Sequence, residues 1–286
     1  MPYLTGGLGG DWVESVRAAA AAGADAIEVG IPFSDPVMDG PTIQAANDLA
    51  LAGGATPVSI LDALRGADVG VPLAVMTYYN IAHRMGLERF ADSLLEAGVS
   101  GCILPDLPLE EAEPWLEVAS EVGVESILLA APTASDDRLP RICGRSRGFV
   151  YGVGLLGVTG VRAELAARAV EIAPRLKAVT DVPVLVGVGV GTPAQAVEAS
   201  RHGDGVVVGS AVVQRMVDGA GPEGVGELVA WFRAALAASC GSHWAVALPG
   251  RPRMVDPPTA STTSSARPGS SHSWIASKTA SPPPIC

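Results

Sequence analysis

Two carboxyl side chains in one short stretch are the strongest candidates for chemistry in this sequence. Glu28 lies within the apolar run Ala26–Val29, and Asp39 lies in a Gly/Pro-rich loop just ahead of a predicted helix. Burial raises the pKa of a carboxyl group, which can then donate and accept protons near neutral pH. Structural alternatives are a buried ion pair for Glu28 and a turn or N-cap role for Asp39, whereas Asp35, before Pro36, fits a turn acid. The pair predicts carboxylate acid–base chemistry.

Three glycine-rich segments in the second half of the sequence indicate an anion site. They end the last three predicted strands and span Gly157–Gly160, Gly187–Gly191 and Val208–Ala211. Exposed backbone N–H groups in such loops, next to the N-terminus of a short helix, bind phosphate. Tight turns alone would also explain the glycines, but three loops converging where a barrel fold binds phosphate favour a phosphate site.

Several other chemistries lack the residues that they need. Gly152–Gly157 matches the dinucleotide pattern GxGxxG, but Val158–Gly160 would interrupt the helix that the motif requires. The four cysteines form no CxxC pair, and His83 and His202 fit surface positions, so no metal site and no histidine-based mechanism is predicted. A net charge of −11 disfavours nucleic acid and anionic membranes. We therefore expect a cytoplasmic protein that acts on a small phosphorylated molecule.

Eight apolar runs of the length of a strand must position these residues. They are Pro2–Thr5, Ala26–Val29, Leu73–Thr77, Gly101–Leu104, Ser126–Ala130, Phe149–Val153, Pro183–Val186 and Gly205–Val208. Continuous apolar strands predict a parallel sheet that is covered on both faces. Eight strand–helix units in about 240 residues favour a (β/α)₈ TIM barrel, with the functional groups at the C-terminal ends of its strands. An open doubly wound sheet is the alternative, because periodicity does not establish closure.

Amphipathic stretches between the runs predict the helices. The first opens at Asp11, with Glu14 as its capping partner, and should bury Trp12, Val16 and either Ala19 or Ala20. Further helices are predicted over 41–53, 57–65, 87–97, 110–122, 136–144, 162–179, 193–201 and 222–238.

The last part of the chain differs in composition from the rest. Residues 240–286 hold one acidic and four basic side chains, are rich in Ser, Thr and Pro, and show no sustained period. Such a segment buries too little apolar surface to offset its chain entropy. We expect residues 1–239 to form the barrel domain and residues 240–286 to be a disordered tail.

The segment Ala24–Gln44 resembles the signature of the tryptophan synthase alpha subunit family. Supporting matches are Pro2–Thr5, Met76–Asn80, Pro105–Pro108, Ala131–Ala134, Gly157–Gly160 and Gly209–Ser210. The resemblance covers residues 2 to about 238 and implies a closed barrel. The family normally begins with a helix that caps the bottom of the barrel, whereas the first strand here starts at residue 2. The expectation is therefore a barrel that lacks this N-terminal helix.

The resemblance implies a lyase reaction, the retro-aldol cleavage of indole-3-glycerol phosphate to indole and glyceraldehyde 3-phosphate. Glu28 matches the main acid–base residue, Asp39 the aspartate that binds the indole N–H, and Thr159 a threonine of the loop that closes the site. The matched phosphate-binding positions are Gly160, Gly189, Gly209 and Ser210. The matched lining of the indole pocket, which core packing would also explain, is Tyr3, Met76, Tyr78, Ile103, Leu129, Tyr151 and Val188.

The family also implies a partner, a beta subunit that holds pyridoxal phosphate in an α2β2 tetramer. Docking would use loops near Pro32–Pro36 and Pro105–Pro108, assigned to the second and third strands, and no cofactor is expected in this chain. One alternative is a stand-alone lyase that releases free indole. Others are a sugar-phosphate isomerase or epimerase on the same barrel, and a non-catalytic activator of a beta subunit.

Overall fold

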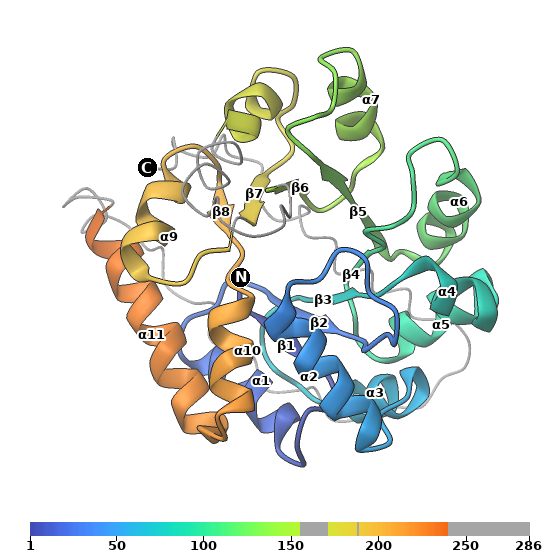
Figure 1. Ribbon diagram of the computed structural model, residues 1–286. Helices are drawn as coiled ribbons and strands as arrows, with labels where there is room; N and C mark the ends of the chain where they lie inside the picture. Colours follow the sequence, from blue (N-terminus) through green and yellow to red (C-terminus); the bar gives the residue numbers. More distant parts are fainter. Residues whose placement is uncertain (155–170, 188, 240–286) are drawn as a thin grey trace, which may run out of the picture.

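A single sheet of eight parallel strands forms the centre of the molecule, as the computed structural model shows for residues 1–154, 171–187 and 189–239 (Figure 1). The strands are β1 (Tyr3–Thr5), β2 (Ile27–Gly30), β3 (Leu73–Met76), β4 (Gly101–Ile103), β5 (Glu125–Ala130), β6 (Val150–Val153), β7 (Val184–Gly187) and β8 (Gly205–Val206). Neighbours in the sequence are neighbours in the sheet. Each predicted apolar run overlaps one of these strands, with ends that differ by one or two residues.

The two ends of the sheet meet, which closes the barrel. Pro2 and Val208 form a parallel bridge beyond the ends of β1 and β8. The backbone N–H of Tyr3 donates to the carbonyl of Val208 at 3.0 Å, and the N–H of Val208 donates to the carbonyl of Met1 at 3.0 Å. This closure confirms the (β/α)₈ barrel and excludes the open doubly wound sheet.

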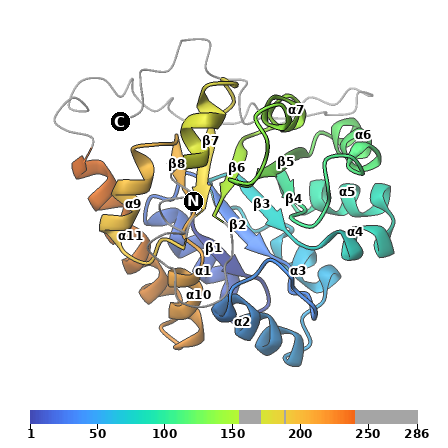
Figure 2. The ribbon, with the colours of Figure 1, turned by 45° about the horizontal axis from the view of Figure 1, so that its top comes forward.

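Helices surround the strands in both ribbon views (Figures 1 and 2). They are α1 (Trp12–Ala21), α2 (Pro41–Ala52), α3 (Pro57–Leu64), α4 (Tyr79–Met85), α5 (Leu87–Glu96), α6 (Glu113–Val122), α7 (Arg138–Arg145), α9 (Pro193–Ser200), α10 (Ser210–Val217) and α11 (Gly221–Ser239). Residues 171–177 are also helical. Among the described residues, no helix is long and apolar enough to cross a membrane.

Alternation along the strands separates the barrel interior from the layer beneath the helices. Ile27 and Val29 of β2 belong to the large core between sheet and helices. Ile103 of β4 and Phe149, just before β6, belong to a separate cluster inside the barrel. Because successive side chains of a strand point to opposite faces, Glu28 projects into the interior. The strand that buries Ile27 and Val29 beneath the helices therefore also places the Glu28 carboxyl group inside the apolar barrel.

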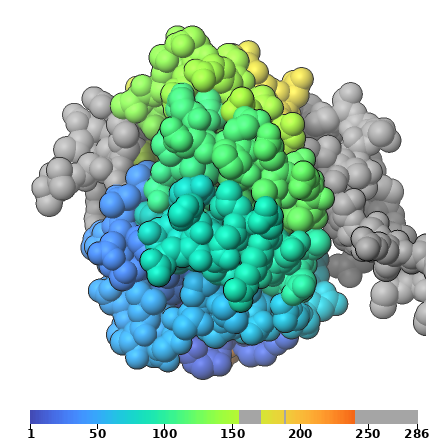
Figure 3. Space-filling view, turned by 90° about the vertical axis from the view of Figure 1, so that its right-hand side faces the viewer, coloured from blue at the N-terminus to red at the C-terminus, as the bar shows by residue number. Residues whose placement is uncertain are grey.

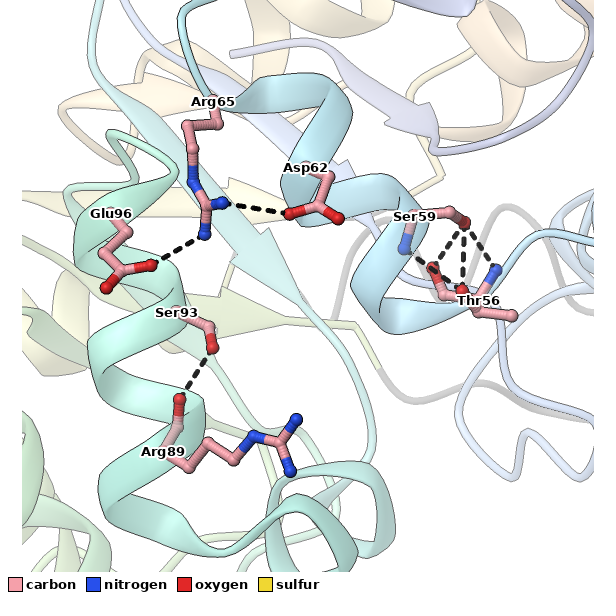
Figure 4. Close-up of polar contacts among 7 residues, drawn as sticks. All are labelled: Thr56, Ser59, Asp62, Arg65, Arg89, Ser93 and Glu96. Carbon is pink, nitrogen blue, oxygen red and sulfur yellow. Dashed lines mark hydrogen bonds and ion pairs between the residues drawn. The ribbon is translucent and has the colours of Figure 1, made fainter.

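Polar contacts on the outer surface fix helix ends and join neighbouring helices (Figure 4). Thr56 and Ser59 form a reciprocal capping box at the start of α3. At the other end of that helix, Arg65 contacts Asp62 at 3.2 Å and Glu96 of α5 at 2.7 Å. Figure 3 shows the flank built by the middle of the chain as a continuous outer surface. These contacts support the scaffold and lie away from the interior carboxyl group.

The helices differ from the sequence prediction in three places. The short helices α4 and α10 were not predicted: α4 has only seven residues, and Gly209–Ser210, at the start of α10, was interpreted as a phosphate loop. The predicted capping partnership at Asp11 is wrong, because Asp11 occupies the N-cap position of α1 but its side chain makes no capping hydrogen bond. Its ψ of 15° departs from the extended backbone that a capping side chain normally requires. The expected burial of Trp12 and Val16 is confirmed.

Residues 240–286 and the first half of the predicted helix 162–179 lie outside the described residues, so the expected tail is untested.

Candidate active site

Glu28 is a buried carboxyl group at the centre of the candidate site. Its residue is 1% exposed, and neither carboxylate oxygen accepts a hydrogen bond from a described residue. Burial raises the pKa of Glu28 to about 8; the Met1 ammonium group opposes the rise, and the negative charge of Asp39 adds to it. No salt bridge joins Glu28 to any described residue, so the described part of the chain gives no support to the ion-pair alternative. A carboxyl in this state is protonated at neutral pH and can act as a proton donor.

Asp39 lies in the loop between β2 and α2 and has different surroundings. The N-cap of α2 is Gly40, so the N-cap alternative for Asp39 is wrong. The side-chain amide of Asn47 donates to the Asp39 carboxylate at 3.2 Å, and that of Gln44 donates to its backbone carbonyl at 2.8 Å. Burial raises the pKa of Asp39 to about 6, opposed by hydrogen bonds from Asn47 and Tyr78. Asp39 is therefore mostly ionised at pH 7, where Glu28 is mostly neutral.

Tyr78 fixes the loop that carries Asp39. It follows β3, and its hydroxyl accepts a hydrogen bond from the backbone N–H of Met38 at 2.9 Å. Its ring stacks on Phe33 with 5.0 Å between centroids. Burial raises the pKa of Tyr78 to about 12, so the hydroxyl keeps its proton at every physiological pH. Two contacts with Tyr78 therefore hold the loop: the hydrogen bond from Met38 to the hydroxyl and the stacking of Phe33 on the ring.

Two further tyrosines of the predicted pocket occupy space that glycines leave free. A Cβ atom on Gly30 would lie 1.9 Å from the Tyr3 hydroxyl oxygen, and one on Gly187 would lie 2.3 Å from a ring carbon of Tyr151. Burial raises the pKa of both tyrosines well above the usual range, helped by the charges of Glu28 and Asp39. The charges of the two carboxyl groups therefore act on the pKa values of both Tyr3 and Tyr151.

The apolar members of the predicted pocket come together inside the barrel. Met76, Leu129 and Tyr151 pack against the interior cluster that contains Ile103. Met76 also packs against a second cluster, centred on Tyr3. Strands far apart in the sequence thus form one apolar wall facing Glu28.

The predicted phosphate positions are described in part. Gly189 has a φ of +65°, a left-handed conformation that favours glycine, and Gly209 and Ser210 stand at the start of α10. Thr159, Gly160 and Val188 lie outside the described residues. The described positions place backbone N–H groups at the N-terminus of an eight-residue helix, where an anion is favoured.

A cavity of about 490 Å³ opens beside this site, between the loops after β4 and β5. Its lining includes Met38, Pro105–Leu109 and Leu129. Pro105–Pro108 follows β4, so the assignment of that docking loop to the third strand is corrected. Val37, next to Met38, is 76% exposed. Val37 and Met38, which is itself 36% exposed, thus form an exposed apolar pair next to the cavity.

The loop after β5 is held by a residue that the sequence did not single out. Arg175 donates to the carbonyls of Pro132 and Ala134 at 2.9 and 2.6 Å, and to the Asp136 carboxylate at 2.7 Å. Asn47 was also missed, although a polar residue between Ala46 and Ala50 on the buried face of α2 was a detectable signal. Nothing in the sequence pairs Arg175 with its loop, which lies about 40 residues away.

Fold and site together define a closed (β/α)₈ barrel protein that holds two carboxyl groups of different proton affinity at its candidate site. Within the described residues, no three His, Cys, Asp or Glu side chains gather as a metal site would require.

Comparison with known proteins gives the family. Residues 1–229 match the family model described as tryptophan synthase alpha chain. The tryptophan synthase alpha chain of Streptomyces coelicolor is 48% identical over 235 residues, covering 80% of this chain and 85% of that protein. The one of Thermobifida fusca is 45% identical over 230 residues, covering 79% and 85%. This chain belongs to the tryptophan synthase alpha chain family, which confirms the predicted enzyme class, a lyase of tryptophan biosynthesis.

Solved structures agree with the family in fold. A structure of tryptophan synthase from Mycobacterium tuberculosis has a TM-score of 0.74 and 40% identity, covering 82% of this chain and 90% of that chain. The tryptophan synthase a2b2 complex from Pyrococcus furiosus has a TM-score of 0.73 and 36% identity, covering 82% and 96%.

Proposed function

We propose that this chain cleaves indole-3-glycerol phosphate to indole and glyceraldehyde 3-phosphate, with Glu28 and Asp39 as its catalytic residues. The observation that carries the proposal is the difference between the two groups: the pKa of Glu28 is raised to about 8, and that of Asp39 to about 6. Two carboxyl groups whose environments separate their pKa values can act as acid and as anion at the same pH.

The reaction needs one proton donor and one anion. Neutral Glu28 gives its proton to C3 of the indole ring, which makes the ring nitrogen positively charged. Ionised Asp39 accepts a hydrogen bond from that N–H and stabilises the charge. The Glu28 carboxylate then takes the proton of the C3′ hydroxyl as the C3–C3′ bond breaks. The bonding electron pair returns to the ring, C3′ becomes the aldehyde carbon, and Glu28 is neutral again.

The remaining residues of the pocket bind the two ends of the substrate. The apolar wall of Met76, Ile103 and Leu129 suits an indole ring. Gly189 and the start of α10 at Gly209–Ser210 suit the phosphate, since a helix N-terminus favours negative charge. The resemblance to the family further assigns Gly160 to phosphate binding, Val188 to the lining of the indole pocket, and Thr159 to loop closure.

A beta subunit is the proposed partner, in an α2β2 assembly. The solved relative from Pyrococcus furiosus is such an a2b2 complex. The exposed Val37 and the cavity lined by Pro105–Leu109 supply an apolar surface for docking on the face that carries Asp39. Pyridoxal phosphate is assigned to the partner, and this chain works with its own side chains alone.

The direct test measures indole released from indole-3-glycerol phosphate by the full chain, with and without a tryptophan synthase beta subunit. Indole should form, rise strongly with the beta subunit, and fall at least 1000-fold in Glu28→Gln, which loses its general acid–base group. Equal activity with and without the partner would favour the stand-alone lyase. A folded protein that releases no indole under either condition would overturn the catalytic proposal and leave a non-catalytic activator.

A further inference from the structure

Asn47 is a buried polar residue that the reaction outlined above does not use. It lies on α2, eight residues after Asp39, and is 3% exposed. Its side-chain nitrogen donates to the Asp39 carboxylate at 3.2 Å. Its side-chain oxygen is buried and has no hydrogen-bond partner in the part of the chain that the structure describes.

The unpaired oxygen makes Asn47 a poor choice for packing alone. A buried carbonyl oxygen without a partner destabilises the folded state, because it has lost its hydrogen bonds to water. Leucine has nearly the same shape, has no polar atom to desolvate, and would match the apolar neighbours Ala46 and Ala50 on this face of α2. The hydrogen bond from the amide nitrogen to the Asp39 carboxylate therefore explains why an amide occupies this position.

The contact also settles which way the amide is turned. A carboxylate only accepts hydrogen bonds, so the amide nitrogen must face it and the oxygen must face the protein interior. We propose that Asn47 is a positioning residue of the active site, which orients the Asp39 carboxylate and keeps it ionised by donating a hydrogen bond from its side-chain amide. The hydrogen bond itself is independent of the proposed function. Only its effect on catalysis rests on that function.

Among the other described groups around Asp39, only Tyr78 also donates a hydrogen bond to its carboxylate. Glu28, from β2, repels the charge of Asp39 whenever it is itself ionised. Tyr3 and Tyr151, from β1 and β6, sense that charge from inside the barrel. Tyr78 is the second donor, and its hydroxyl also accepts the backbone N–H of Met38.

The test titrates Asp39 directly, independent of catalysis. The side-chain carboxyl carbons of aspartate are labelled with carbon-13, and the Asp39 signal is identified by its loss in Asp39→Asn. In Asn47→Leu the pKa of Asp39 should rise by about one to two units, because a hydrogen bond to a charged group is worth about 1.5–3 kcal/mol. Asn80→Leu, the same change at the other asparagine of the chain, exposed on α4, should leave the Asp39 titration unchanged.

Two further readouts separate a positioning role from a packing role. At pH 4, where Asp39 is protonated in both folded proteins, Asn47→Leu should unfold at the same urea concentration as the wild type or a higher one. Its kcat should fall about fivefold at pH 7, and the deficit should shrink as the pH rises and Asp39 ionises again. A merely structural residue would give a loss of stability and a deficit that does not depend on pH.

The outcomes that would overturn the proposal are distinct from those that would overturn the function. An unchanged Asp39 pKa in a folded Asn47→Leu protein refutes the positioning role. Asn47→Ala provides a second variant, and if both lose their native structure, Asn47 is a core residue and the proposal fails. If the pKa rises as expected but the wild type releases no indole, the positioning role stands and the proposed reaction fails.

Discussion

Replacing Glu28 with glutamine should change how the stability of the protein depends on pH. Burial raises the pKa of Glu28 from 4.5 to about 8, so the folded state holds a proton between these values that the unfolded state has released. Folding stability therefore falls as the pH rises through this window, and the loss is complete above about pH 8. Glutamine has nearly the same shape and does not titrate.

The size of the effect follows from the displacement of the pKa. One pKa unit corresponds to about 1.4 kcal/mol, so the penalty is about 1 kcal/mol at pH 5 and about 3 kcal/mol at pH 7. Relaxation around a buried charge reduces these figures, which are upper limits. The free energy of unfolding of Glu28→Gln, relative to the wild type, should thus rise by about 2–4 kcal/mol between pH 5 and pH 8.

Urea unfolding at pH 5, 6, 7 and 8, followed by circular dichroism, measures this difference. Glu117→Gln is the matched control, because it makes the same change at an exposed position on α6 and should run parallel to the wild type. If the two glutamine variants give the same pH dependence, Glu28 titrates as an ordinary surface carboxyl, and the argument from burial is refuted.

Three other predictions concern the scaffold of the site. Arg175→Gln should speed hydrogen exchange in residues 131–136 about tenfold, because each tenfold change reflects about 1.4 kcal/mol of local stability. Gly187→Ala should lower the free energy of unfolding by about 1–3 kcal/mol, since the new methyl group would overlap the ring of Tyr151, and urea unfolding measures this. Thr56→Ala should lower it by about 1 kcal/mol through loss of the capping box of α3, measured in the same way.

Matched variants make these results interpretable. Arg145→Gln removes an ion pair on α7 and should not change exchange in residues 131–136. Gly144→Ala places a methyl group in open space and should not destabilise the protein. A loss as large in Gly144→Ala as in Gly187→Ala would mean that the overlap with Tyr151 is not the cause. Unchanged exchange in Arg175→Gln, or unchanged unfolding in Thr56→Ala, would contradict the roles given to those contacts.

The strands and the burial of Glu28 could be predicted because both follow from the same feature of the sequence, the continuous apolar runs. A parallel sheet covered on both faces needs continuous apolar runs, and a glutamate inside such a run is buried whichever face it points to. The ends of helices were harder to predict. Asp11 has the right residue type for a cap, yet its backbone angles leave the side chain unbonded.

The supporting contacts of the site could not be predicted, because they depend on how separate elements pack. Asn47 reaches Asp39 only because the chain turns back at Gly40 into α2. Tyr78 was expected to line a pocket, but the hydrogen bond from Met38 shows that it also holds the loop that carries Asp39. Arg175 meets its loop through the packing of neighbouring strand–helix units, which a local pattern does not encode.

The pH dependence of kcat/KM for indole release tests the central claim most directly. Asp39 must be ionised and Glu28 must be neutral, so the profile should be bell-shaped with limbs near pH 6 and pH 8. The basic limb is decisive, since the substrate phosphate also titrates near pH 6 and contributes to the acid limb. A tenfold fall per pH unit above pH 8 is the predicted result. A profile that stays level or rises from pH 7 to pH 10 would contradict the account, because Glu28 could not then be the proton donor.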